Sequence, residues 1–248
     1  MESPVFYAPP ERWDGGTIEL PAPEAHHAQT VLRLRAGALV TVIDGLGRAG
    51  VGEIILSGGR HLSVRVHSEI RNFGEPMVKV TLAAGLSTGS KFDEVVEKGT
   101  ELGVSRFVPI ITDKSKVRLD VASKANTRVT RLEKVALAAI KQCRRSYRPV
   151  ISTPTRLKQY LRETDGGSLN LIFVPDPSAT PLSRVTRTGE VRRVSILIGP
   201  ESGFSADEVR WAVEAGFVTV TLGSRVLRTE TAGPVCVALV LQMLGELS

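Results

Sequence analysis

The sequence of 248 residues contains little of what stabilises disulfide-rich or membrane proteins. It has two cysteines, Cys143 and Cys236, far apart and without a CxxC pair, so we expect reduced, buried thiols rather than a disulfide or a metal pair. Its longest apolar stretch, near residues 235–244, is much shorter than a membrane span, and residues 1–6 carry no signal pattern. These absences predict a cytoplasmic protein.

Histidine is also scarce. The chain has four, His26, His27, His61 and His67, all in its N-terminal half and without the spacing of metal ligands. We expect them to be surface or structural residues, and we predict no metal site.

Three glycine-containing segments resemble ligand-binding motifs but lack the required context. Gly45–Gly50 matches the dinucleotide pattern GxGxxG, yet an apparent strand follows it where a helix is needed, which predicts a hairpin turn. Gly85–Lys91 has one residue too few between its glycines for a phosphate-binding P-loop. Gly199–Gly203 is one residue off the GxSxG nucleophile elbow. The sequence therefore argues against a nucleotide triphosphatase and a serine hydrolase.

Positive charge is concentrated in one segment. The net charge is +6 overall, but residues 1–75 carry 7 basic and 9 acidic residues, whereas residues 114–148 carry 11 basic and 2 acidic residues. Such a segment suits a polyanion, because each neutralised phosphate releases counterions and adds affinity. The alternative is a solvated helix face.

The hydrophobic pattern changes near residues 71–76. Before this point, short alternating runs predict a β-meander that closes into a small barrel, with one helix at about 23–35. Beyond it, strands alternate with helices, which predicts a parallel sheet covered by helices on both faces. We therefore expect an α/β protein of two domains, residues 1–73 and 74–248.

Two strand-to-helix corners stand out in the second domain. Ile198–Gly203 follows a buried strand and precedes a predicted helix over 205–215, and Leu222–Arg228 leads to the apolar segment Pro234–Leu247. If their strands are neighbours, both corners lie at the carboxyl edge of the sheet, where such folds bind ligands. Their glycines would let backbone groups approach a bound ligand closely, although ordinary turn glycines are the alternative.

The two corners carry a family resemblance. Ile198-Gly-Pro-Glu-Ser-Gly-Phe204 and Leu222-Gly-Ser-Arg-Val-Leu-Arg-Thr-Glu-Thr-Ala232 resemble segments of the ribosomal RNA small subunit methyltransferase E family, the 16S rRNA uridine-N3 methyltransferases of the SPOUT superfamily. Lys98–Val104 and Gln142–Arg145 extend the resemblance, and the N-terminal region resembles the family's PUA-like domain. The chain departs at Ser202, where the family usually has glycine; a positive φ there would strain this serine.

The resemblance implies a fold and an activity. The expected fold is a PUA-like β-barrel that binds RNA, followed by a SPOUT-type parallel sheet with a trefoil knot, in a homodimer. The expected reaction is S-adenosylmethionine-dependent methylation of N3 of one uridine in 16S rRNA of the small ribosomal subunit. Two alternatives remain: a knotted methyltransferase acting on a ribose 2′-hydroxyl or a tRNA base, and a non-catalytic RNA-binding assembly factor.

The resemblance also assigns candidate site residues. Arg228 would stabilise negative charge on the uracil or hold a phosphate, and Glu230, or less directly Glu201, would accept the proton or orient Arg228. The alternative is that Arg228 and Glu230 pair to hold the corner closed. The expected cofactor contacts are Val174, Pro175, Ile198, Gly199, Pro200, Glu201, Ser202, Gly203, Leu222, Gly223, Val226, Leu227 and Arg228. The expected RNA contacts are Arg33, Arg35, Lys114, Lys116, Arg118, Arg144, Arg145 and Arg148.

Overall fold

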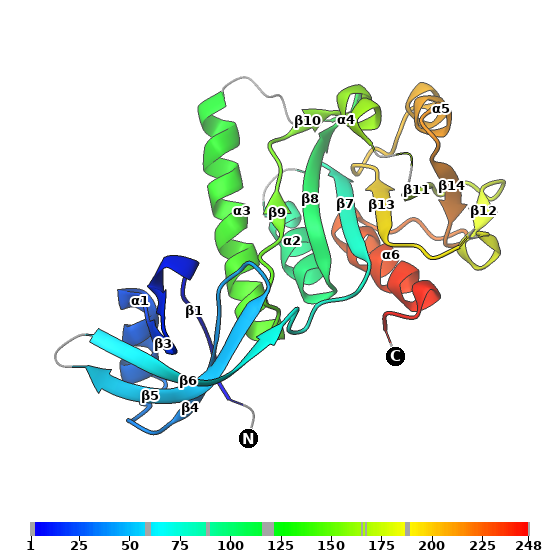
Figure 1. The fold of residues 1–248 in the computed structure, drawn as a ribbon. Coiled ribbons are helices and arrows are strands. Elements are labelled where there is room, and N and C mark those ends of the chain that lie inside the picture. Colours follow the sequence, from blue (N-terminus) through cyan, green and yellow to red (C-terminus); the bar gives the residue numbers. More distant parts are fainter. Residues whose placement is uncertain are drawn as a thin grey trace. The chain divides into compact units, whose positions relative to one another are not determined.

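The computed structural model describes residues 3–57, 61–87, 90–115, 122–164, 166, 168–186 and 189–247. The chain forms two compact units (Figure 1): Met1–Glu75 with Leu137–Arg148, and Pro76–Ala136 with Pro149–Ser248. The boundary between Glu75 and Pro76 lies close to the domain boundary expected after residue 73. The segment 137–148, which the sequence pattern assigns to the second domain, belongs to the first unit.

The first unit contains a six-stranded sheet in the order β1-β4-β5-β6-β3-β2. Its strands are β1 (Val5–Tyr7), β2 (Trp13–Asp14), β3 (Thr17–Glu19), β4 (Leu39–Ile43), β5 (Arg48–Ser57) and β6 (His61–Arg71). Among the described strands of this sheet, only β1 and β4 pair in parallel, and the other pairs are antiparallel. Phe6, Ile18, Val40, Ile54 and Val64 come from five of these strands and meet in one buried cluster, and a second, smaller cluster joins β4 and β5 to the segment 137–148. Its edge strands β1 and β2 do not pair with each other within the described residues.

The helix expected over 23–35 is shorter in the structure. Helix α1 (Ala22–His26) continues into a π-helical turn, η2 (His27–Val31), and the chain then leaves the helical conformation at Arg33, whose φ is 53°.

A hairpin joins β4 to β5, as the sequence pattern predicts. One carboxylate oxygen of Asp44 accepts hydrogen bonds from the backbone N–H groups of Leu46 (2.7 Å) and Arg48 (3.0 Å), which closes the turn. Gly45 and Gly47 adopt positive φ values of 75° and 106°. Because a strand and not a helix follows, the GxGxxG match is a turn and not a dinucleotide site.

A buried ion pair attaches the segment 137–148 to the end of β6. The Arg145 side chain donates from Nε (3.2 Å) and Nη2 (2.8 Å) to one oxygen of Glu75, and the other oxygen accepts from the Tyr147 backbone N–H (2.8 Å). The two side chains are 2% and 3% exposed. A charge buried to this degree is stable only while its partner remains.

The second unit contains an eight-stranded sheet in which every pairing is parallel, with the order β10-β8-β7-β13-β11-β14-β12 and β9 paired to β8. Its strands are β7 (Lys79–Gly85), β8 (Val104–Ile111), β9 (Val150–Ile151), β10 (Thr155–Arg156), β11 (Leu169–Phe173), β12 (Thr180–Pro181), β13 (Arg193–Ile198) and β14 (Val218–Thr221). This arrangement confirms the predicted α/β fold.

Helices cover both faces of this sheet (Figure 1). They are α2 (Lys91–Glu101), α3 (Ala122–Cys143), α4 (Leu157–Glu163), α5 (Ala206–Glu214) and α6 (Thr229–Leu244). Successive strand residues point to opposite faces. In β7, Leu82 therefore joins the cluster of α2, α6 and the first part of α3, whereas Ala83 joins the cluster of α4 and α5. No helix in the described part of the chain is both long and apolar enough to cross a membrane.

The two corners follow β13 and β14, but these strands are not neighbours. Strand β11 lies between them and pairs with both. Because all three strands are parallel, their carboxyl ends still meet at one edge of the sheet. Helix α6 also begins earlier than the apolar pattern indicates, at Thr229, so Pro234 lies inside the helix.

We expect replacement of Arg145 by methionine to destabilise the protein by about 3–5 kcal/mol, because it leaves the buried carboxylate of Glu75 unpaired. Urea unfolding followed by circular dichroism measures the loss. The matched control is Arg65→Met, which removes an exposed pair with Glu53 in the same unit and should cost about 1 kcal/mol or less. Equal losses in the two variants would contradict a structural role for the buried pair.

Candidate active site

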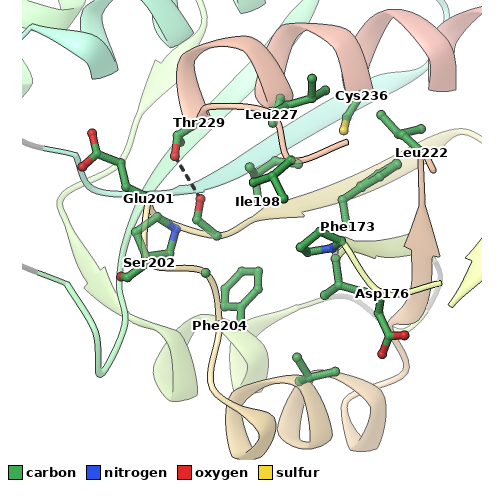
Figure 2. A pocket seen from close by; sticks show the side chains of 18 of the residues that line it. Phe173, Asp176, Ile198, Glu201, Ser202, Phe204, Leu222, Leu227, Thr229 and Cys236 are labelled. Carbon is green, nitrogen blue, oxygen red and sulfur yellow. Dashed lines mark hydrogen bonds between the residues drawn. The ribbon is translucent and has the colours of Figure 1, made fainter. Parts of the chain in front are cut away.

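A pocket of about 610 Å³ opens at the carboxyl edge of the parallel sheet (Figure 2). Three loops form it, following β11, β13 and β14, together with the first turns of α5 and α6. The residues that line it are Phe173, Val174, Pro175, Asp176, Pro177, Ile198, Gly199, Pro200, Glu201, Ser202, Gly203, Phe204, Ser205, Ala206, Val209, Leu222, Gly223, Arg225, Val226, Leu227, Thr229, Ala232 and Cys236.

The loop after β13 lies directly against the end of β7. A Cβ atom on Gly85 would lie 2.3 Å from the backbone nitrogen of Pro200, a distance that real side chains do not tolerate. Glycine at position 85 is therefore what lets this loop approach the sheet. Ser202 does not adopt a positive φ, so the strain considered for this position is absent.

Hydrogen bonds join this loop to the segment after β8. The Ser202 hydroxyl donates to the carbonyl of Lys114 (3.0 Å), and the Lys114 ammonium donates to the carbonyl of Phe204 (3.3 Å). Buried Glu208 completes a capping box with Ser205 and accepts from the backbone N–H of Asp113 (2.9 Å). The pocket wall thus has support from outside its own loop.

The loop after β14 is shaped by Gly223, whose φ of 103° is accessible to few other residues. Its N–H donates to the Thr221 hydroxyl (3.2 Å), which tightens the turn. Arg228 is the N-cap residue of α6, and its carbonyl accepts from the N–H groups of the first turn. The adjacent Thr229 hydroxyl donates to the Gly199 carbonyl (3.2 Å, dashed in Figure 2) and so connects the two corners.

The pocket combines an apolar interior with three charged lining residues, Asp176, Glu201 and Arg225. Phe173, Ile198 and Leu222 supply apolar surface from the three strand ends. Burial raises the pKa of the Cys236 thiol and keeps it neutral. Hydrogen bonds from the Ser178 backbone N–H (2.8 Å) and hydroxyl (2.7 Å) lower the pKa of the Asp176 carboxyl, so a carboxylate lines the pocket at neutral pH.

Four charged residues gather beside the pocket: Lys91, Glu201, Arg228 and Glu230, here called the charged cluster. The Lys91 ammonium donates to Glu201 and lies 4.0 Å from one carboxylate oxygen of Glu230. The Glu201 carboxylate points away from the apolar side chains in Figure 2. The other oxygen of Glu230, Oε2, is buried and has no hydrogen-bond partner among the described residues.

The structure brings most of the predicted cofactor contacts together. Each of them lines the pocket except Arg228, which lies outside it with an exposed side chain. The alternative role for this corner, a pairing of Arg228 with Glu230, is not seen within the described part of the chain. The cation nearest to Glu230 there is Lys91.

Several lining residues escaped the sequence analysis, among them Asp176, Phe204, Thr229, Ala232 and Cys236. The last three follow a helical spacing of three and four residues, which places them on one face of α6. The spacing predicts these pocket residues only if the helix is taken to begin at Thr229 and not near Pro234. Asp176 and Phe204 directly follow predicted contacts, but their side chains carry no pattern of their own.

The expected RNA contacts differ in how exposed their side chains are. Arg33, Arg35, Lys114 and Arg148 are exposed. Arg144 is partly buried and donates to the Ser3 carbonyl (3.0 Å).

Lys116 and Arg118 lie outside the described residues. The assignment of Arg145 is wrong, because its side chain is buried against Glu75 and cannot reach a phosphate. Within the basic segment, Arg131 and Lys141 also pair with the carboxylates of Asp93 and Glu24.

Comparison with known proteins connects this geometry to a family. The sequence profile described as "RNA methyltransferase domain" matches residues 74–241, and the profile described as "RNA methyltransferase PUA domain" matches residues 20–66. A relative from Synechocystis sp., named ribosomal RNA small subunit methyltransferase E, is 29% identical over 231 residues, covering 92% of this chain and 74% of the relative.

Solved structures agree with this result. The crystal structure of a ribosomal RNA small subunit methyltransferase E from Neisseria gonorrhoeae, bound to S-adenosyl methionine, has a TM-score of 0.86 at 28% identity and covers 98% of both chains. That of a probable rRNA-methyltransferase from Porphyromonas gingivalis has a TM-score of 0.83 at 30% identity, again over 98% of both chains. The chain therefore belongs to the ribosomal RNA small subunit methyltransferase E family of RNA methyltransferases, with an N-terminal PUA domain, as its two corner motifs predict.

Proposed function

We propose that this chain transfers a methyl group from S-adenosylmethionine to N3 of a uridine in 16S rRNA of the small ribosomal subunit. The observation that carries the proposal is a three-loop pocket with a carboxylate and a guanidinium group, Glu230 and Arg228, directly beside it. The names of these relatives support ribosomal RNA as the substrate. A ribosomal RNA substrate in turn favours action in the cytoplasm.

The pocket residues fit S-adenosylmethionine. The volume of about 610 Å³ lies in the range of small-molecule sites. Gly199, Gly203 and Gly223 line the pocket without side chains, so that an adenine can approach the loop backbone closely, and Ile198 and Leu222 offer apolar surface to its ring. Asp176 would attract the positively charged groups of the cofactor. When bound, the cofactor supplies an electrophilic methyl carbon on a positively charged sulfur.

The charged cluster provides the groups that uridine N3 needs. N3 is a weak acid that must lose its proton for a bond to form. Glu230 accepts this proton, because its Oε2 is a buried acceptor with no donor among the described residues. Arg228, an exposed cation that cannot act as a base, offsets negative charge on the uracil oxygens or holds a phosphate. Glu201 is less suited to the proton transfer, since it already accepts from Lys91.

We expect S-adenosylmethionine to bind in the absence of RNA and Gly223→Val to abolish binding, measured by titration calorimetry. The matched control is Gly216→Val. Both glycines have a positive φ, 103° and 86°, and open space where a Cβ would stand, but only Gly223 lines the pocket. Backbone strain is therefore comparable, and only the pocket variant should lose affinity. Equal loss in both variants would point to strain rather than to the pocket.

We expect the reaction product to be N3-methyluridine, identified by nucleoside analysis of the treated RNA. Glu230→Gln should lower kcat about 10²- to 10⁴-fold, the range of a lost general base, while cofactor affinity is kept. Arg228→Ala should also lower turnover. A 2′-O-methyl product would support the ribose alternative, and cofactor binding without any turnover would support the assembly-factor alternative. If both variants fail to fold, Glu230 and Arg228 have a structural role at this corner instead of a catalytic one.

We propose that RNA contacts the exposed cations Arg33, Arg35, Lys114 and Arg148. Arg144 is partly exposed and belongs to the same proposal. Lys116 and Arg118 remain proposed RNA contacts. In the variant Arg33→Glu/Arg35→Glu, the slope of log Kd against log salt should flatten by about 0.7–0.9 for each phosphate that the variant no longer neutralises. The control is Arg210→Glu, an exposed arginine on α5 that pairs with its own helix. A slope equal to that of the wild type would refute the assignment.

We also propose a homodimer with α6 at its interface, because Leu239 of this apolar helix is 42% exposed. Light scattering should give the mass of two chains for the wild type and of one chain for Leu239→Asp. The control Val213→Asp, at an exposed apolar residue of α5, should remain dimeric.

The trefoil knot of the SPOUT fold is a further part of the proposal. It is supported by α6, which follows β14 yet packs against β7 and β13. Stretching a single chain from both ends tests it, since a knotted chain stops short of its full extended length.

A further inference from the structure

Lys91 connects two segments that carry candidate catalytic carboxylates. It is the first residue of α2, and its ammonium donates to Glu201 on the loop after β13. The same nitrogen lies 4.0 Å from Oε1 of Glu230 in the first turn of α6. The lysine and Glu201 side chains are about one third exposed, whereas that of Glu230 is 13% exposed. One cation therefore serves both a surface carboxylate and a nearly buried one.

The local charges keep this lysine protonated. The hydrogen bond to Glu201 is the main cause that raises the pKa of Lys91, and desolvation opposes it. The charges of Glu201 and Glu230 raise this pKa further and that of Arg228 lowers it, so that the net shift is upward. Asp93, also on α2, is engaged elsewhere, in an ion pair with Arg131 at 2.8 Å. The charged cluster thus contains two carboxylates and two cations, and removing Lys91 would leave it with an excess of negative charge.

The two oxygens of Glu230 have different surroundings. Oε1 faces the Lys91 ammonium, while the buried Oε2 has no partner among the described residues. We propose that Lys91 is a positioning residue that holds Glu230 through Oε1, so that Oε2 remains the acceptor for the proton of uridine N3. This inference rests on the function proposed above. In the step, the N3–H bond breaks, its proton passes to Oε2, and the N3 electron pair forms the bond to the transferred methyl carbon. The bond between that carbon and the sulfonium sulfur breaks at the same time, and its electron pair stays on the sulfur, which leaves as a neutral thioether.

The proposal has a kinetic signature. Lys91 is proposed to act on the proton transfer and not on binding, so Lys91→Met should lower kcat and leave KM for the RNA nearly unchanged. Lys91 does not line the pocket, so its replacement should leave cofactor affinity within about twofold of the wild type.

The test compares Lys91→Met, Lys91→Arg and the control Lys98→Met on the full chain with ribosomal RNA as substrate. Lys98 lies on the same helix and forms exposed pairs with Glu97 and Glu101. We expect Lys91→Met to lose about tenfold or more in kcat, with KM for the RNA nearly unchanged. Lys91→Arg keeps the charge and should retain most activity, and Lys98→Met should behave as the wild type. A loss in Lys91→Arg as large as that in Lys91→Met, or a loss that appears in KM instead of kcat, would overturn the proposal.

A double-mutant cycle with Glu230→Gln supplies the second measurement. If Lys91 acts through Glu230, Lys91→Met should reduce kcat no further in the Glu230→Gln background. Independent, multiplicative losses would overturn the proposal, even if Lys91→Met proves poorly stable. The wild-type product reports separately on the proposed function. If the wild type methylates an atom other than uridine N3, the proposed function is wrong. The double-mutant cycle would still measure the energetic coupling between Lys91 and Glu230.

Discussion

The hydrogen bond from the Thr229 hydroxyl to the Gly199 carbonyl joins the two corners on which the site depends. The corners follow β13 and β14, which β11 separates in the sheet. Parallel pairing brings their carboxyl ends to the same edge, and this contact then draws the start of α6 against the loop after β13. The close approach of Pro200 to Gly85 fixes the same loop from the side of β7.

This arrangement places binding and proton transfer at adjoining sites. Glycine backbone and apolar side chains form most of the pocket, and the carboxylate of Asp176 lies in the loop after β11. The charged cluster meets the pocket at Glu201, which belongs to both, and its other members come from α2 and the start of α6. Like charges in such a cluster are tolerable only when cations intervene. The position of Lys91 between two carboxylates meets this need and makes α2, otherwise a core helix, part of the proposed chemistry.

Net charge is an incomplete guide to RNA contact in this chain. Residues 114–148 are strongly basic, but Arg131, Lys141 and Arg145 each pair with a carboxylate from a distant part of the sequence. The pairing of Arg145 with Glu75 is buried and holds the end of α3 in the first unit. A count of charges along the sequence cannot separate such pairs from free cations, because the partners lie 38 to 117 positions away.

The resemblance to a known family indicated about half of the residues that line the pocket. By itself, the sequence determined the alternation of strands and helices, the hairpin at Asp44 and the two glycine corners. These features depend on local periodicity and turn chemistry, which neighbouring residues encode. Only the tertiary structure decided that β11 separates the corner strands, that α6 begins at Thr229, that Arg145 is buried and that Lys91 joins the charged cluster. The physical reason is that strand order and ion pairing join segments far apart in the chain, and no local pattern records which distant group each side chain meets.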